Sequence, residues 1–192
     1  MQLSQTSINI PNTIASIVFI IATTYFLFKH EWVAAYICAI AGSAYIFMVI
    51  KSDTNTDPLN RSARYLDWAL TTPLTVYIIL GLAGFSEREK LIIAGADLAM
   101  IFAGWMGTKQ PQNMLMWFTV GCLLFLPVFY YLFLVTRRKG HAAVAILTLV
   151  VWLIYPIVYI IDRYKLIDKA AIEWFLIILD MTAKVGYGIL ES

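Results

Sequence analysis

Seven apolar segments fill most of the sequence and leave little choice of fold. Each is about 18–24 residues long, the length that crosses roughly 30 Å of hydrocarbon as an α-helix. The connections between them are short, so consecutive helices should lie side by side and antiparallel. We therefore predict an all-α membrane protein, a bundle of seven transmembrane helices forming one domain over residues 1–192, with the fourth helix the shortest. The segments lie at approximately 10–29, 32–50, 63–85, 90–107, 113–136, 141–161 and 170–190.

The composition excludes a soluble globular protein. Hydrophobic residues make up 61% of the chain and charged residues only 14%, with a mean hydropathy of +0.77. The net charge of +2 and the absence of a basic tract give no reason to expect nucleic acid as a partner. Cys38 and Cys122 lie inside apolar segments, where a thiol acts as a small hydrophobe. We expect an integral, multi-pass membrane protein surrounded by lipids.

The number of lysine and arginine residues between the segments does not decide the orientation of the chain in the membrane, because each side of the membrane has six. One side has Lys29, Arg88, Lys90, Arg137, Arg138 and Lys139, and the other has Lys51, Arg61, Lys109, Arg163, Lys165 and Lys169. Only the dense cluster at 137–139 favours the cytoplasm for its loop. This predicts an extracellular N-terminus and a cytoplasmic C-terminus.

Charged residues occur at membrane depth in two of the segments. Asp180 and Lys184 are one helical turn apart in the seventh segment, and Arg64, Asp67 and Thr71 share one face of the third. Such charges are costly in a bilayer and usually face one another or a polar cavity. A single pair could equally serve to fix helix packing. Two carboxylates with two cations instead indicate a buried charge site.

Two motifs within these segments resemble a known family. RYLDWALTTPL at 64–74 and LDMTAKVGYG at 179–188 are similar to the third and seventh helices of microbial (type 1) rhodopsins, the family of bacteriorhodopsin. The resemblance covers essentially the whole chain, which is short for the family, and small members of this kind occur in viral and metagenomic lineages. It implies that all-trans retinal is bound covalently to Lys184 as a protonated Schiff base.

The resemblance also assigns roles around that lysine. Asp67 matches the counterion and proton acceptor, Asp180 the second counterion, and Arg64 the arginine beneath them. A buried cation needs an anionic counter-charge, so physical chemistry agrees with this assignment. Tyr45 matches a tyrosine close to Asp180, and we include it with Thr71 in the hydrogen-bond network of the site. No metal is expected.

A row of aromatic residues on the sixth segment is a candidate wall for the retinal pocket. Trp152, Tyr155 and Tyr159 lie at i, i+3 and i+7 and share one helix face. Such a row by itself is more often ordinary helix packing. The resemblance implies that Trp68 and Trp152 cover the two faces of retinal, whereas Tyr159 stands where many members have tryptophan. The remaining pocket candidates are Thr72, Thr75, Asp97, Met100, Gly104 and Trp117, the last near the retinal ring.

Asp97 is a third carboxylate at membrane depth, and no cation is available near it. We therefore expect it to be protonated and hydrogen-bonded. The family pattern pairs it with Thr72, which makes a structural link between the third and fourth helices, with a lesser effect on the timing of the light cycle. Thr75 is expected to influence the colour of the chromophore.

The sequence departs from the pattern of outward proton pumps at Ile78. Many pumps have a proton-donating carboxylate at this position, eleven residues after the acceptor, and isoleucine cannot donate a proton. Glu31, beside His30, is a candidate cytoplasmic donor, although both also fit ordinary interfacial residues. Glu173 is either a proton-release group or a carboxylate that is solvated at the start of its helix.

Three functional classes fit these features, and none is an enzyme. The first is a light-driven outward proton pump, with Asp67 as acceptor. The second is a sensory photoreceptor with a slow light cycle, which the missing donor favours and which would need a separate transducer protein. The third is a light-gated cation channel, which ranks last because no carboxylate lies between Trp32 and Ile50. We expect a homo-oligomer, either a trimer or a pentamer.

Overall fold

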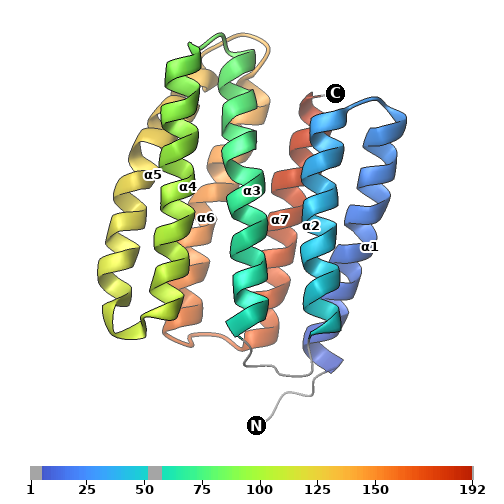
Figure 1. The fold of residues 1–192 in the computed structure, drawn as a ribbon, viewed down its shortest axis with the longest axis vertical. Coiled ribbons are helices and arrows are strands. Elements are labelled where there is room, and N and C mark those ends of the chain that lie inside the picture. The colour runs from blue at the N-terminus through green and yellow to red at the C-terminus, as the bar shows by residue number, and fades with distance from the viewer. Residues whose placement is uncertain (1–5, 52–57, 192) are drawn as a thin grey trace. The chain divides into compact units, whose positions relative to one another are not determined.

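The computed structural model describes residues 6–51 and 58–191, with side chains for 10–51 and 61–191. These residues form seven α-helices and one short 3₁₀ helix, η1, and none of them lies in a β-strand. The predicted all-α, seven-helix fold is therefore confirmed (Figure 1). The helices are α1 (Thr6–Phe28), α2 (Trp32–Ile50), α3 (Pro58–Leu82), α4 (Glu87–Lys109), η1 (Pro111–Asn113), α5 (Met114–Thr136), α6 (Ala142–Arg163) and α7 (Lys169–Glu191).

Two predicted boundaries shift because of local end chemistry. Ser86 caps α4: its side chain accepts a hydrogen bond from the Glu89 backbone, and the Glu89 side chain accepts one from the Ser86 backbone. This capping box makes residues 87–89 the first turn of α4 rather than part of a connection. The fourth helix, with 23 residues, is therefore not the shortest, since α2 has 19. Part of the predicted connection at 52–62 lies outside the described residues, and α3 begins at Pro58.

Six helices, α1 to α6, contain stretches that are long and apolar enough to cross a bilayer. The seventh, α7, has 23 residues and sufficient length, but its charged residues are spread along the whole helix. Charged residues are rare in lipid-spanning helices unless they serve a function. Its charged residues are Lys169, Glu173, Asp180, Lys184 and Glu191.

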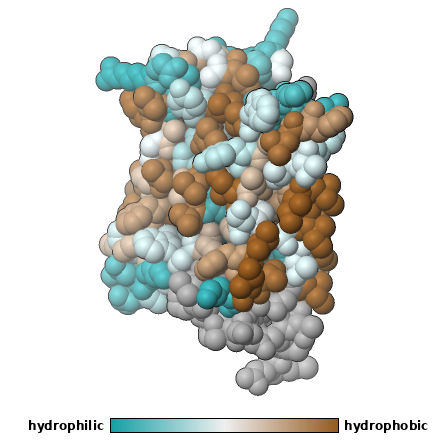
Figure 2. Space-filling view, turned by 45° about the vertical axis from the view of Figure 1, so that its right-hand side comes forward, coloured by the Kyte–Doolittle hydropathy of each residue, from teal (hydrophilic) through white to brown (hydrophobic). Residues whose placement is uncertain are grey.

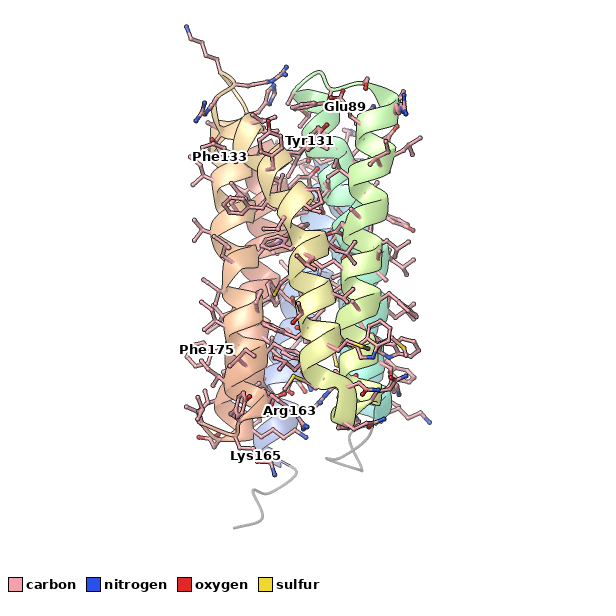
Figure 3. All side chains as sticks on the ribbon, turned by 90° about the vertical axis from the view of Figure 1, so that its left-hand side faces the viewer. Glu89, Tyr131, Phe133, Arg163, Lys165 and Phe175 are labelled. Carbon is pink, nitrogen blue, oxygen red and sulfur yellow. The ribbon has the colours of Figure 1, made fainter. Side chains whose placement is uncertain are left out.

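The surface is that of a membrane protein. Large apolar side chains are widely exposed, among them Phe28 at 82%, Ile50 at 70% and Leu115 at 68%. Figure 2 shows apolar residues over much of the middle of one face, with hydrophilic residues gathered mainly toward its ends. In Figure 3, Glu89 and Tyr131 lie near one end of their helices. Exposed apolar surface of this extent would aggregate in water and needs lipid as its solvent.

The first compact unit comprises the described residues up to Arg64 together with 150–191. Within it α1 packs against α2 and α7, which Figure 1 shows side by side. Small residues such as Ala15, Ala34 and Ala41 line these contacts and let the helices approach closely. The ring of Phe19 stacks on Tyr45 with centroids 5.6 Å apart. These contacts hold α2 and α7 in the arrangement that the site requires.

The second compact unit runs from Tyr65 to Leu149 and contains most of α3, all of α4 and α5, and the start of α6. Its helices α4 and α5 pack against each other along their length (Figure 1). The guanidinium of Arg138 donates a hydrogen bond to the backbone carbonyl of Ala83 and lies over the ring of Phe85 at 4.5 Å. This residue therefore fastens the loop after α5 to the end of α3.

Gly188 on α7 should not tolerate a larger side chain. A Cβ atom there would lie 2.8 Å from Cε2 of the buried Phe26 ring and 2.9 Å from Cβ of Ala34. Gly188→Ala is expected to lower the free energy of unfolding by about 1–3 kcal/mol, because a closely packed interior cannot absorb another methyl group. Thermal unfolding in detergent measures the change. Gly95→Ala is the matched control, since nothing lies within 4 Å of that position; equal losses for both variants would contradict the packing argument.

Candidate functional site

The centre of the first unit is the Asp180 carboxylate, which is fully buried on α7. Tyr45 on α2 donates a 2.5 Å hydrogen bond to its Oδ2 atom, and the hydroxyl of Tyr155 on α6 donates to Oδ1. The Lys184 ammonium nitrogen lies 3.8 Å from Oδ1, one turn further along α7. Two phenols and one cation from three helices thus surround a single anion, with charge-assisted hydrogen bonds on both of its oxygens.

Lys184 lies in apolar surroundings. Its side chain is only 5% exposed, and its nitrogen is 5.9 Å from the centroid of the Phe19 ring. A buried amine of this kind needs an anionic partner, and Asp180 supplies one. The predicted pairing of the two residues is therefore present in the structure.

A second ion pair lies toward the beginning of α7. Arg64 on α3 donates a 2.8 Å hydrogen bond to Oε2 of Glu173, and both side chains are largely buried. The Arg64 guanidinium also lies over the ring of Tyr45, 5.7 Å from its centroid. Tyr45 thus touches Arg64 with its ring and Asp180 with its hydroxyl. Glu173 is held by an arginine rather than freely solvated at the helix start.

The second unit contains the predicted acceptor Asp67, which is buried on α3 with 1% exposure. The hydroxyl of Thr71 donates to the backbone carbonyl of Asp67 at 2.8 Å and lies 3.4 Å from its Oδ1 atom. Thr75 repeats this pattern one turn later by donating to the carbonyl of Thr71 at 2.9 Å. Because α3 is continuous, Arg64, Asp67 and Thr71 share one face of it, as the spacing predicted.

The predicted link between α3 and α4 is also present. The hydroxyl oxygen of Thr72 lies 2.6 Å from Oδ2 of Asp97 and 2.9 Å from the carbonyl oxygen of Trp68. A hydroxyl has only one proton to donate. Both contacts can be full hydrogen bonds only if the Asp97 carboxyl carries a proton and donates it to Thr72. The geometry therefore supports the expected neutral Asp97, which is fully buried.

The aromatic pocket candidates fall in both units. In the second unit, the Tyr65 and Trp68 rings meet edge to face at 5.1 Å. Tyr65 also fills the space beside Gly104, where a Cβ would be 3.0 Å from its ring. Met100 is half-buried, and the indole nitrogen of Trp117 donates to Oε1 of Gln110 at 3.1 Å. In the first unit, Trp152 is buried and Tyr159 half-buried.

The structure brings together three residues of which the sequence reading selected only one. Tyr187 and Glu191 on α7 lie near Glu31, which precedes the first turn of α2. A signal for the two missed residues was available, since Lys184, Tyr187 and Glu191 follow a spacing of i, i+3 and i+7. This spacing alone does not mark a site, because tyrosine and glutamate near a helix end are ordinary interfacial residues.

Comparison with known proteins places this architecture among the rhodopsins. The family described as bacteriorhodopsin-like protein matches residues 3–192. Sensory rhodopsin III of Haloarcula marismortui is 28% identical over 165 residues, which are 78% of this chain and 71% of that protein. Bacteriorhodopsin-II of the same organism is 32% identical over 66% of this chain and 56% of its own length, so the match spans less than two thirds of that relative.

The fold itself is that of solved rhodopsin structures. The crystal structure of the proton pumping rhodopsin AR2 from the marine alga Acetabularia acetabulum matches with a TM-score of 0.87. The match covers 96% of this chain and 92% of that one, at 21% sequence identity. A likeness at this identity establishes the seven-helix fold and leaves function to the residues of the site.

Proposed function

Because this chain belongs to the bacteriorhodopsin-like protein family, we propose that it is a light-driven outward proton pump that binds retinal within one seven-helix transmembrane domain. Proteins with this fold include sensory and proton-pumping rhodopsins rather than enzymes, in line with the sequence prediction. The observation that carries the proposal is the buried Lys184 nitrogen, 3.8 Å from the carboxylate of Asp180.

The residues around Lys184 fit all-trans retinal bound through a protonated Schiff base. Such a linkage keeps a positive charge on the Lys184 nitrogen, and Asp180 provides the opposite charge at ion-pair distance. Tyr45 and Tyr155 hold that carboxylate from two other helices, so its position does not depend on Lys184 alone. When bound, retinal supplies light absorption and an isomerisation that drives the cycle. Trp68 and Trp152 are the proposed walls of its pocket, with Thr72, Thr75, Met100, Gly104, Trp117 and Tyr159 around it.

Asp67 is the proposed acceptor of the proton that leaves the Lys184 nitrogen. Asp180 already accepts hydrogen bonds on both oxygens and is better suited to remain a fixed counter-charge. Asp67 is buried, and the nearby Thr71 hydroxyl can orient its carboxyl group. A carboxylate can take up a proton and hold it, which is the step that directional transport requires.

Proton release is proposed to occur at the Arg64–Glu173 pair. Glu173 lies two helical turns from Asp180, toward the beginning of α7. With the N-terminus outside, this is the extracellular half of the helix. Arg64 contacts both Glu173 and the ring of Tyr45. Movement of its guanidinium would therefore change the positive charge near Glu173 and near Tyr45.

A sensory photoreceptor is the second candidate. Ile78 occupies the position of the usual proton donor, and a slow cycle would prolong a signalling state. A relative named sensory rhodopsin III supports this alternative, in which a separate transducer protein would be the partner. A light-gated channel ranks below both, because α2 contains no carboxylate between Trp32 and Ile50. For each of these functions we propose that the protein assembles in the membrane as a homo-oligomer, either a trimer or a pentamer, surrounded by lipids.

Illumination of cells that contain the retinal-loaded protein distinguishes a pump from a sensor. For an outward pump, the external medium is expected to acidify in light and to return in darkness. A protonophore should abolish the change, since it collapses any proton gradient. External pH recorded with a glass electrode is the measurement. A completed light cycle without any pH change would exclude pumping and favour the sensor.

A further inference from the structure

The end of α7 beyond Lys184 carries two polar side chains that the proposed mechanism does not use. Tyr187 and Glu191 follow Lys184 by three and seven residues, so all three share one face of the helix. Seven residues correspond to about 10 Å of helix rise. Asp180 precedes Lys184 by one turn and therefore lies in the opposite direction. Glu191 is thus a carboxyl group on the side of Lys184 away from its counterion.

These two side chains form a cluster with Glu31. Tyr187 has no exposed surface, and the charged groups near its hydroxyl are the carboxylates of Glu191 and Glu31. Glu31 lies at the start of α2, so the cluster joins two helices of the same compact unit. Phe26 and Ala34 pack against Gly188 beside Tyr187 and surround this part of α7 with apolar atoms.

The cluster has unsatisfied polar atoms. Within the described part of the chain, Tyr187 Oη and Glu191 Oε2 are buried and face each other, but neither makes a hydrogen bond of normal geometry. Buried polar atoms are nearly always hydrogen-bonded, so two such exceptions side by side call for a functional explanation.

Electrostatics at this position favour a stored proton over a structural ion pair. A carboxylate in the last turn of a helix faces the negative end of the helix dipole, which opposes a negative charge there. Glu31 adds a second carboxylate to the same cluster, and like charges repel. Helix stability therefore does not account for a glutamate at 191. A carboxyl group that holds a proton is neutral, so neither the helix dipole nor Glu31 opposes it.

We propose that Glu191 is the internal proton donor to the Lys184 nitrogen, with Tyr187 as the positioning residue between them and Glu31 as the neighbour of Glu191. This inference rests on the proposed retinal site. In the transfer the O–H bond of Glu191 breaks and an N–H bond forms at Lys184. The Glu191 carboxylate then regains a proton from the aqueous phase on its own side, so charge and protons balance without another reactant. Glu191 thereby takes the role of the proton-donating carboxylate that is missing at position 78, where the chain has Ile78.

Infrared spectroscopy tests the stored proton without reference to transport. The wild-type protein, with or without retinal, is expected to show the carbonyl stretch of a protonated carboxyl group that is missing from the Glu191→Gln variant. The corresponding band of Asp97 is common to both proteins and cancels in the difference. Glu31→Gln should keep the Glu191 band. Identical spectra for wild type and Glu191→Gln would overturn the proposal.

Flash kinetics test the transfer itself. After a light flash, the visible band of wild type should recover at a rate that is independent of external pH, because the donor is internal. Glu191→Gln is expected to recover at least about 10-fold more slowly, with a rate that falls about 10-fold for each unit of rising pH, since the proton then comes from water. A small permeant acid such as azide should restore the rate. Tyr187→Phe should slow recovery while keeping it independent of pH.

Controls separate this inference from simpler explanations. Glu191→Asp keeps the carboxyl group and should keep the pH-independent recovery, whereas Glu87→Gln alters a carboxylate that is 70% exposed and should leave the rate unchanged. A recovery rate of the visible band in Glu191→Gln within twofold of the wild-type rate would overturn the assignment. So would a recovery rate that depends on pH in Glu31→Gln but not in Glu191→Gln. A chain that gains no visible band with retinal would instead refute the proposed function.

Discussion

Lys184→Ala is expected to abolish the visible absorption band of the retinal-loaded protein. Alanine has no nitrogen to which retinal can attach, and the substitution removes the nitrogen that lies 3.8 Å from Asp180. Reconstitution of the purified variant with all-trans retinal, followed by absorption spectroscopy, measures the loss. Circular dichroism should show that the helices remain.

Lys90→Ala is the matched control for this variant. Lys90 is the other buried lysine of the described chain, but its nitrogen pairs with Glu87 at 2.5 Å and lies over the ring of Tyr77. It should keep the visible band at nearly full amplitude. A full band in Lys184→Ala, or its loss in Lys90→Ala, would refute the assignment of retinal to Lys184.

Asp67→Asn is expected to lower light-driven proton transport by at least about 100-fold, in the range that a positioned acid–base group contributes. Asparagine has nearly the same shape as aspartate but cannot take up the proton. The variant should still bind retinal, because Lys184 is unchanged, and its absorption maximum should shift because a negative charge is lost. External pH under illumination and absorption spectra are the two measurements.

Asp162→Asn provides the comparison. Asp162 lies at the end of α6, where it is partly exposed and pairs with Arg61 at 3.6 Å. Surface ion pairs contribute little to stability, so its loss should leave transport unchanged. Transport that persists in Asp67→Asn would remove Asp67 from the role of acceptor.

Much of the fold could be predicted because the bilayer restricts spanning segments to a narrow range of lengths and compositions. All seven helices appear near their predicted positions. The errors lie at helix ends, where hydropathy carries little information. The capping box of Ser86 and Glu89 extended α4 into a predicted connection through two hydrogen bonds that a hydropathy profile does not detect.

Pairs within one helix were also predictable. Asp180 and Lys184 meet because i and i+4 lie on the same helix face, and Arg64, Asp67 and Thr71 follow from the same geometry. The link from Thr72 to Asp97 joins two helices, and it was expected only through the resemblance to microbial rhodopsins.

The sequence by itself determined seven helices and the charged faces of the third and seventh of them, because both follow from local periodicity and hydrophobicity. Only the tertiary structure decided that Tyr155 and Tyr45, 25 and 135 residues away in sequence, would bind the two oxygens of Asp180. Only the tertiary structure placed Glu31 near enough to Tyr187 and Glu191 to act on them electrostatically. The physical reason is that contacts between helices depend on how each helix is rotated and shifted against its neighbours, and the packing of all their side chains sets that register.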